Sequence, residues 1–168
     1  MACAQTLAGL VNDCQQSIGG VKNIYVAPYV ESAATLDAKS EEIASFAEDV
    51  TWKKYYVRKN TSGFTSTLNV NDDGGSYVST ELSLVFNRME TKKRIEMTAL
   101  TLSDLMVVVE DANGVRWFMG FNEPATVSAG TGESGTSKSD SNRYTLSITS
   151  EDATYPYSLA SDCVLKGI

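Results

Sequence analysis

Residues 77–121 read YVSTELSLVFNRMETKKRIEMTALTLSDLMVVVEDANGVRWFMGF and carry the strongest fold signals in the chain. The first ten of them alternate apolar and polar side chains, which is typical of a strand with one buried face. Leu82, Leu84 and Phe86 share that face, and the alternation shifts register near Ser79–Thr80. The segment therefore predicts a strand with an irregular beginning.

A helix is expected directly after this strand. Asn87 offers an N-cap oxygen, and Glu90 stands three residues on, where a capping box places its acid. Glu90 with Arg94, and Lys92 with Glu96, have the four-residue spacing of helical ion pairs. The apolar side of the helix is predicted to consist of Ile95, Ala99, Leu102 and Met106.

A buried hairpin is expected to follow the helix. Residues 105–109 form a continuous apolar run, as in a strand covered on both faces. Asn113 and Gly114 favour a tight turn, and residues 115–121 then supply the partner strand.

Other segments add strands on both sides of this central unit. Residues 62–70 alternate and are followed by the turn sequence NDDGG at 71–75, so they predict a long hairpin with 77–86. In residues 21–30, Pro28 favours an edge or a bulge in the second half. The remaining predicted strands are 51–60, 143–150 and a weaker one at 155–164.

The chain is expected to form an N-terminal arm, residues 1–20, and a single domain, residues 21–168. Two long loops are predicted within the domain. Residues 31–49 are acidic and rich in Ala and Ser, which indicates a helical turn or a long loop. Residues 122–142 are dominated by Gly, Ser and Thr, and form either a mobile loop or a long hairpin that is ordered against a partner. The predicted fold class is α+β and mainly antiparallel β: two packed sheets in a sandwich or partly open barrel, with one flanking helix.

Charge and composition narrow the classes of function. The 168 residues are 42% hydrophobic and 21% charged, which is ordinary for a globular protein, and the net charge is −7. This charge argues against a protein that grips nucleic acid along an external face. It is compatible with a surface that nucleic acid passes without binding.

Histidine and cysteine usage excludes several kinds of active site. Because the chain has no histidine, zinc sites built from Cys and His and all His-based relays are excluded. The three cysteines, Cys3, Cys14 and Cys163, lack metal-ligand spacing and are interpreted as small buried residues in a reducing compartment. We find no signal peptide and no apolar stretch of membrane-spanning length, so we expect synthesis in a cytoplasm and no membrane segment.

No other motif predicts an enzyme or a cofactor. The acidic turns at 71–75 and 110–114 lack the twelve-residue pattern of a calcium loop. The glycine-rich residues 129–135 lack the Gly-Lys-Ser/Thr ending of a phosphate loop. Nothing singles out a pair of catalytic carboxylates. We expect a protein without catalysis, metal or cofactor.

The sequence TWKKYYVRKN at 51–60 interleaves aromatic and basic side chains. Single-stranded nucleic acid binders use this combination. The interpretation favoured by the net charge is an amphipathic strand whose basic face meets water or an acidic surface of a neighbouring copy. Long exposed hairpins and a polar loop would leave unpaired strand edges in a monomer, and such edges tend to pair with other chains. This is a first indication that the protein assembles with other copies.

The ordered series of these features resembles tail tube proteins of bacteriophages, especially a group from phages of Bacteroides-like hosts. The residues that carry the resemblance are GGVK at 19–22, IYV at 24–26, Tyr77, ELSLVF at 81–86, KKR at 92–94, VVVED at 107–111, NG at 113–114, RWFMG at 116–120 and SNRYTL at 141–146.

The resemblance implies a two-sheet β fold with a flanking helix, shared with the tubes of secretion and contractile injection systems. It also implies homo-oligomeric, hexameric rings that stack into a tube, with DNA passing through the lumen without specific binding. The protein would lie in the virion tail beside other tail proteins, after assembly in the bacterial host cytoplasm. A tail connector or terminator ring is the alternative within the same class.

Two sets of residues become candidates for binding. The candidate subunit-interface residues are Trp52, Lys53, Lys54, Arg58, Lys59, Phe64, Asp72 and Asp73. The alternative of a different class is a monomeric β-sandwich binding module of carbohydrate or adhesin type. It would hold a glycan through Trp52, Tyr55, Tyr56 or Trp117.

Overall fold

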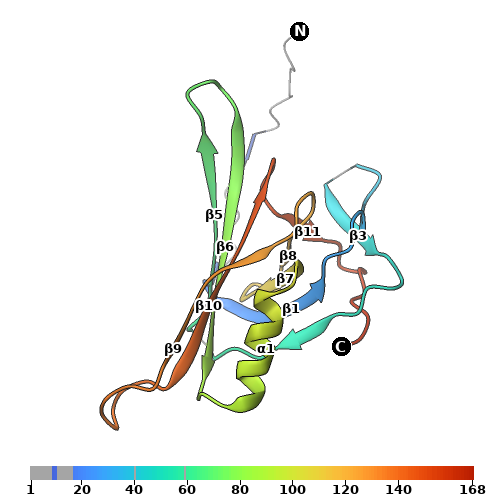
Figure 1. Cartoon of the computed structure of the whole chain (residues 1–168). Coiled ribbons are helices and arrows are strands. Elements are labelled where there is room, and N and C mark those ends of the chain that lie inside the picture. Colours follow the sequence, from blue (N-terminus) through green and yellow to red (C-terminus); the bar gives the residue numbers. More distant parts are fainter. Residues whose placement is uncertain (1–8, 11–16, 40, 59) are drawn as a thin grey trace.

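The computed structural model describes residues 9–10, 17–39, 41–58 and 60–168 (Figure 1). Its one helix in these ranges is α1 (Thr91–Thr101). The strands are β1 (Val21–Pro28), β2 (Ala34–Leu36), β3 (Glu42–Phe46), β4 (Lys53–Tyr55), β5 (Gly63–Val70), β6 (Ser76–Asn87), β7 (Leu105–Asp111), β8 (Arg116–Met119), β9 (Thr126–Glu133), β10 (Arg143–Asp152) and β11 (Tyr157–Leu159).

The strands form two sheets. The larger sheet has the order β2-β3-β11-β8-β7-β1-β4, and the smaller one has the order β5-β6-β10-β9. Every strand pair is antiparallel except β11 with β3. The predicted fold class is therefore confirmed: mainly antiparallel β in two packed sheets, with α1 beside them.

The smaller sheet consists of two long hairpins. The predicted pairing of residues 62–70 with 77–86 is confirmed by the continuous β5–β6 register from Gly63–Ser83 to Val70–Ser76. The predicted irregularity near Ser79–Thr80 is wrong, because Thr80 is buried and keeps the alternation intact. Its hydroxyl lies 3.0 Å from that of Ser66 on β5, so a polar side chain is satisfied inside an apolar face.

Strand β7 lies between two hydrophobic clusters, as the continuous apolar run predicts. One cluster lies between the sheets and contains Leu105, Val107 and Val109 of β7 with residues of β1, β6, β10 and α1. The other lies on the opposite face of the larger sheet and contains Met106 and Val108. It is closed by segments around β2, β3 and the chain after β11. The larger sheet is thus buried on both faces.

The helix differs from the prediction in its start and its apolar side. Asn87 does not cap it, because β6 continues pairing through Asn87, and the cap position falls at Glu90 without a side-chain hydrogen bond. Leu100 is the buried residue of α1, while Ile95 and Leu102 are 55% and 83% exposed. The apolar side predicted for the helix included Met106, which lies in β7 and not in α1. Including Met106 in the helical pattern placed the apolar side on the wrong face of the helix.

Both predicted long loops contain strands. In residues 31–49 a β2–β3 hairpin replaces the expected helical turn or loop, because Ile43 is fully buried in the second cluster and β3 also pairs with β11. In residues 122–142, β9 pairs with β10 within the same chain. Small residues that contribute little to a core can still join a sheet through their backbone.

Strand β1 lies between β7 and β4, but β4 pairs only with Ile24, Tyr25 and Val26. Its last two residues, Ala27 and Pro28, pair with β7 alone, so the strand ends at an open edge, as Pro28 predicted. Most of the predicted N-terminal arm lies outside the described residues. Its end is held by the β7–β8 turn, since Ile18 N donates to Asn113 Oδ1 and Asn113 Nδ2 donates to Ile18 O.

Candidate assembly surfaces

The outward face of the smaller sheet is mainly polar and slightly acidic, with Tyr77 and Val85 as its larger aromatic and apolar side chains. Its side chains include Thr65, Thr67, Ser79, Glu81, Ser83, Ser147, Thr149 and Glu151, which the strand registers place on one side. The larger sheet and α1 lie on the other side (Figure 1). The four strands contain no lysine and one arginine, Arg143, which pairs with Glu133. This face offers hydrogen-bonding groups but no free positive charge.

The same sheet has two open edges. Strand β5 pairs only with β6, and β9 pairs only with β10, among the described residues. Each edge carries unpaired backbone N–H and C=O groups along eight residues. Such edges are ready to pair with another strand.

The β5–β6 hairpin extends past the larger sheet (Figure 1). Near its tip, Leu68 and Val70 are 47% and 67% exposed although they point toward the same side as the core-facing residues of β5. The hairpin therefore continues an apolar face beyond the core that would cover it. Sequence alternation identified the strand but gave no sign that its end would be uncovered.

A groove of about 550 Å³ separates α1 from β9. Met97 and Leu102 line it from the helix, and Tyr144 and Leu146 line it from the sheet. Gly132 keeps this groove open, because a Cβ there would lie 2.8 Å from Tyr144 Cε1. The glycines that resembled a phosphate loop thus leave room for large neighbouring side chains.

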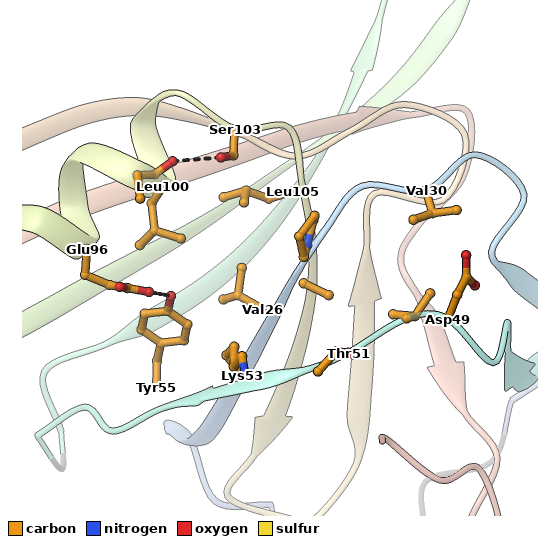
Figure 2. Close-up of a pocket in the computed structure, with 14 residues that line it drawn as sticks. Val26, Val30, Asp49, Thr51, Lys53, Tyr55, Glu96, Leu100, Ser103 and Leu105 are labelled. Atoms are coloured by element: carbon orange, nitrogen blue, oxygen red, sulfur yellow. Dashed lines mark hydrogen bonds between the residues drawn. The ribbon is translucent and has the colours of Figure 1, made fainter. Parts of the chain in front are cut away.

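A second groove, of about 460 Å³, lies between β4 and α1 (Figure 2). Val26, Leu100 and Leu105 form its apolar floor, and Lys53 stands at its rim. The Tyr55 hydroxyl donates to Glu96 Oε1 and so joins β4 to the helix. Burial raises the pKa of the Tyr55 phenol well above its usual value, and the bond to Glu96 raises it further. This tyrosine stays a neutral hydrogen-bond donor.

The predicted interface residues do not form one surface. Trp52 is 0% exposed and packs against Phe46 and Phe118 in the second cluster, so it is a core residue and holds neither a subunit nor a glycan. Lys53 and Arg58 are exposed. Lys54 is half-buried, with its ammonium 5.1 Å from the centre of the Tyr56 ring. Lys59 lies outside the described residues.

The other predicted interface residues belong to the β5–β6 hairpin. Phe64 is half-buried against the first cluster, so it contributes to the core. Asp72 and Asp73 are exposed in the turn at the tip of the hairpin. The tip is distant from β4, the teal arrow beside α1 in Figure 1, so the acidic and basic candidates lie apart within one chain.

The titratable groups perform structural tasks. Glu110 accepts hydrogen bonds from Asn23 Nδ2 at 2.7 Å and pairs with Lys22 Nζ at 2.8 Å. Burial alone would raise the pKa of Glu110, but these contacts outweigh it and hold the pKa below its usual value. Cys163 is buried, as the sequence predicts, whereas Cys3 and Cys14 lie outside the described residues.

Across the described ranges, no three His, Cys, Asp or Glu side chains gather as metal ligands would. None of the helices in the described part of the chain has the length and apolarity to cross a bilayer. No protein-family model, curated protein or solved structure matches this chain.

Proposed function

We propose that this chain is a structural, non-catalytic subunit of a bacteriophage tail that assembles into rings, which stack into a DNA-conducting tube. The residue pattern that resembles tail tube proteins motivates the proposal. The observation that supports it most is the smaller sheet, which combines two open edges among the described residues with a mainly polar, lysine-free face.

The edges suit ring formation. When β5 of one copy pairs with β9 of the next, the backbone groups of both edges are satisfied and the sheet continues around the ring. The contact uses different surfaces of the two partners, so it is heterologous and closes into a ring when the rotation per subunit permits. A tube subunit needs this kind of contact.

The outward face suits a channel wall. Its two carboxylates, Glu81 and Glu151, form no ion pair among the described residues and repel a phosphate backbone, and its strands offer no lysine to bind one. In the assembled ring this face would line the lumen, while α1 and the larger sheet would lie outside. The protein would then be found in the virion tail, having been assembled in the host cytoplasm with other tail proteins.

A connector or terminator ring would use the same edges and is distinguished only by the extent of stacking. A glycan-binding module has less support, because Trp52 is buried and the Tyr55 hydroxyl is bonded to Glu96. Tyr56, 80% exposed, is the one proposed glycan contact that stands largely free.

Size-exclusion chromatography with negative-stain imaging of the purified chain tests the assembly. We expect rings of constant diameter, with stacked rings at high protein concentration. A connector would give rings that do not lengthen into tubes. A monomer that persists at high concentration would overturn the proposal.

The lumen assignment predicts a gain of DNA retention in the Glu81→Lys, Glu151→Lys double variant. Subunits are assembled with short duplex DNA and then treated with nuclease, and the protected DNA is measured. We expect the wild-type tube to protect little, and the variant to protect at least about tenfold more at low salt, because new lysines contact phosphates.

The matched control is Glu31→Lys, Glu41→Lys, which makes the same charge change at exposed sites near the β2–β3 hairpin. DNA bound there stays accessible to nuclease if that end lies outside the tube. Equal protection by both variants would show that the outward face of the smaller sheet is not the lumen wall.

A further inference from the structure

The groove between α1 and β9 is an uncovered apolar surface. Met97, Leu102 and Val127 contribute its larger aliphatic side chains together with Leu146 of β10, and Leu102 is 83% exposed. Arg94 is the one charged side chain among the described residues that line the groove. The groove therefore suits an apolar, uncharged segment better than a charged one.

The two ends of the groove can be placed along β9. Leu105, three residues after Leu102, exchanges two backbone hydrogen bonds, of 2.9 and 2.8 Å, with Ala125, directly before β9. At the other end, a Cβ on Gly132 would lie 3.2 Å from Cε of Met89, which precedes the helix. The helix thus runs beside β9, with Leu102 near the start of the strand and the beginning of the helix near Gly132.

Strand β5 supplies a segment of the kind that suits the groove. It has no charged side chain, and its Leu68 and Val70 are 47% and 67% exposed on the core-facing side of the smaller sheet. When β5 of the next copy pairs with β9, the two strands share this face of the sheet. Leu68 and Val70 of that copy then lie on the same side as the α1–β9 groove.

The register between the two edges decides how far these side chains lie along the groove. One row of paired residues crosses the sheet: Gly63, Ser83, Ser147 and Ala129. A level register would continue this row by setting Gly63 of the next copy beside Ala129, and Leu68 would then pass the start of β9. A stagger of four residues, from Ala129 to Glu133, instead pairs β5 with β9 along almost their whole length.

The staggered register also agrees with the geometry of a closed sheet. Strands in a barrel tilt by about 35–45° from the axis, which requires neighbouring strands to be staggered. Four residues across the four strands of the smaller sheet is one residue per strand, the stagger that gives a tilt of about 36° in an eight-stranded barrel of shear eight. Because β9 has a bulge next to Val127, this register sets Leu68 beside Val127, at the Leu102 end of the groove.

We propose that the α1–β9 groove of each subunit receives Leu68 and Val70 of the neighbouring subunit's β5, and that this contact fixes the four-residue stagger of the ring. The inference rests on the proposed function, because it requires β5 and β9 of adjacent copies to pair. It adds what edge pairing leaves open. Strand β9 is polar and glycine-rich, so its backbone specifies a register only weakly, whereas apolar side chains that meet the groove in one register select that register.

Engineered disulfides measure the register. All variants carry Cys3→Ser and Cys14→Ser. Thr65→Cys is combined either with Thr131→Cys, opposite it in the staggered register, or with Thr126→Cys, level with it across the sheet. After mild oxidation we expect the first pair to give a ladder of covalent oligomers on non-reducing gels, at least about tenfold stronger than the second, because directly opposed residues lie within disulfide range.

Charged substitutions test what occupies the groove. Leu102→Asp and Leu68→Lys should each raise the dissociation constant of ring formation at least about tenfold, because each removes an apolar side chain from the contact. The two changes together should recover most of the loss, since the new charges are opposite and face each other between subunits. Val164→Asp alters a similarly exposed aliphatic side chain after β11 and should leave the dissociation constant unchanged. Analytical ultracentrifugation compares the four proteins.

A ladder from the Thr126 pair in place of the Thr131 pair would overturn the stagger and leave edge pairing standing. Normal rings from Leu102→Asp would show that the groove holds no part of the neighbouring subunit and would overturn the inference, as would an equal loss of rings in Val164→Asp. Rings that give no ladder from either cysteine pair would overturn edge pairing itself. A wild-type chain that forms no rings would instead overturn the proposed function.

Discussion

The Trp52→Ala variant is expected to lose about 3 to 5 kcal/mol of unfolding free energy, the usual cost of removing a fully buried large aromatic side chain. Trp52 is 0% exposed, and its ring centre lies 5.0 Å from that of Phe46 and 6.5 Å from that of Phe118. Both pairs have edge-to-face geometry, which adds to the effect of burial. The variant leaves a cavity in the cluster that closes the larger sheet.

The matched variant Trp52→Phe should cost less than about 1.5 kcal/mol, because it keeps an aromatic ring in the same apolar site. The indole Nε1 has no hydrogen-bond partner in the described part of the chain. Phenylalanine removes this buried donor, which offsets part of the lost packing. Most of the stability lost in Trp52→Ala should therefore be retained in Trp52→Phe.

Urea denaturation followed by circular dichroism measures both variants, and the fluorescence of Trp117, the one remaining tryptophan, gives a second probe. Coincident transitions would support two-state unfolding. If Trp52→Ala unfolded at the wild-type urea concentration but no longer assembled, Trp52 would act at a subunit contact. The buried position predicts the reverse, a loss of stability first.

A strand could be predicted from the sequence where its own apolar pattern shows which of its faces are buried. The alternation of β5, β6 and β10 and the unbroken apolar run of β7 depend on side chains two residues apart, so each strand could be predicted from its own residues. Thr80 shows the limit of this reasoning. A threonine in the buried face looked like a break in register because its partner, Ser66, lies on another strand.

Tertiary context decided the elements that were predicted wrongly. The acidic, alanine-rich residues 31–49 resemble a helical turn locally, but they form β2 and β3 because Ile43 fills a site made by β11 and the second cluster. Trp52 stands beside two lysines and so looked like part of a surface, yet it precedes β4 and turns into the core. Neither contact is encoded within its own segment.

The candidate surfaces were predicted in part for a similar reason. Asp72, Asp73, Lys53 and Arg58 are exposed, because short charged segments beside turns and edges seldom become buried. The grooves beside α1 were not predicted, since they arise from how far the helix stands from two sheets. Leu102 is exposed beside α1, whereas Leu68 and Val70 are exposed because the β5–β6 hairpin extends past the larger sheet.

If β5 of one copy pairs with β9 of the next, the Thr65→Lys, Thr131→Lys variant should fail to form rings. Both threonines are exposed and point outward on the open edge strands β5 and β9. Strands of neighbouring copies would lie about 5 Å apart, and in the register that sets residue 65 opposite residue 131 the two lysines face each other within a Debye length. Like charges brought together cost several kcal/mol at an interface, and we expect ring dissociation constants to rise at least about a hundredfold.

The variant Thr65→Lys, Thr131→Glu separates repulsion from loss of threonine. It changes the same two residues but places opposite charges on the adjoining edges, so rings should persist and should weaken with added salt. Analytical ultracentrifugation across a range of protein concentrations compares the two variants directly. Monomers from the lysine pair, with rings from the lysine–glutamate pair, require the two edges to meet. Rings of normal stability from both variants would overturn pairing of the edges in the register that sets residue 65 opposite residue 131.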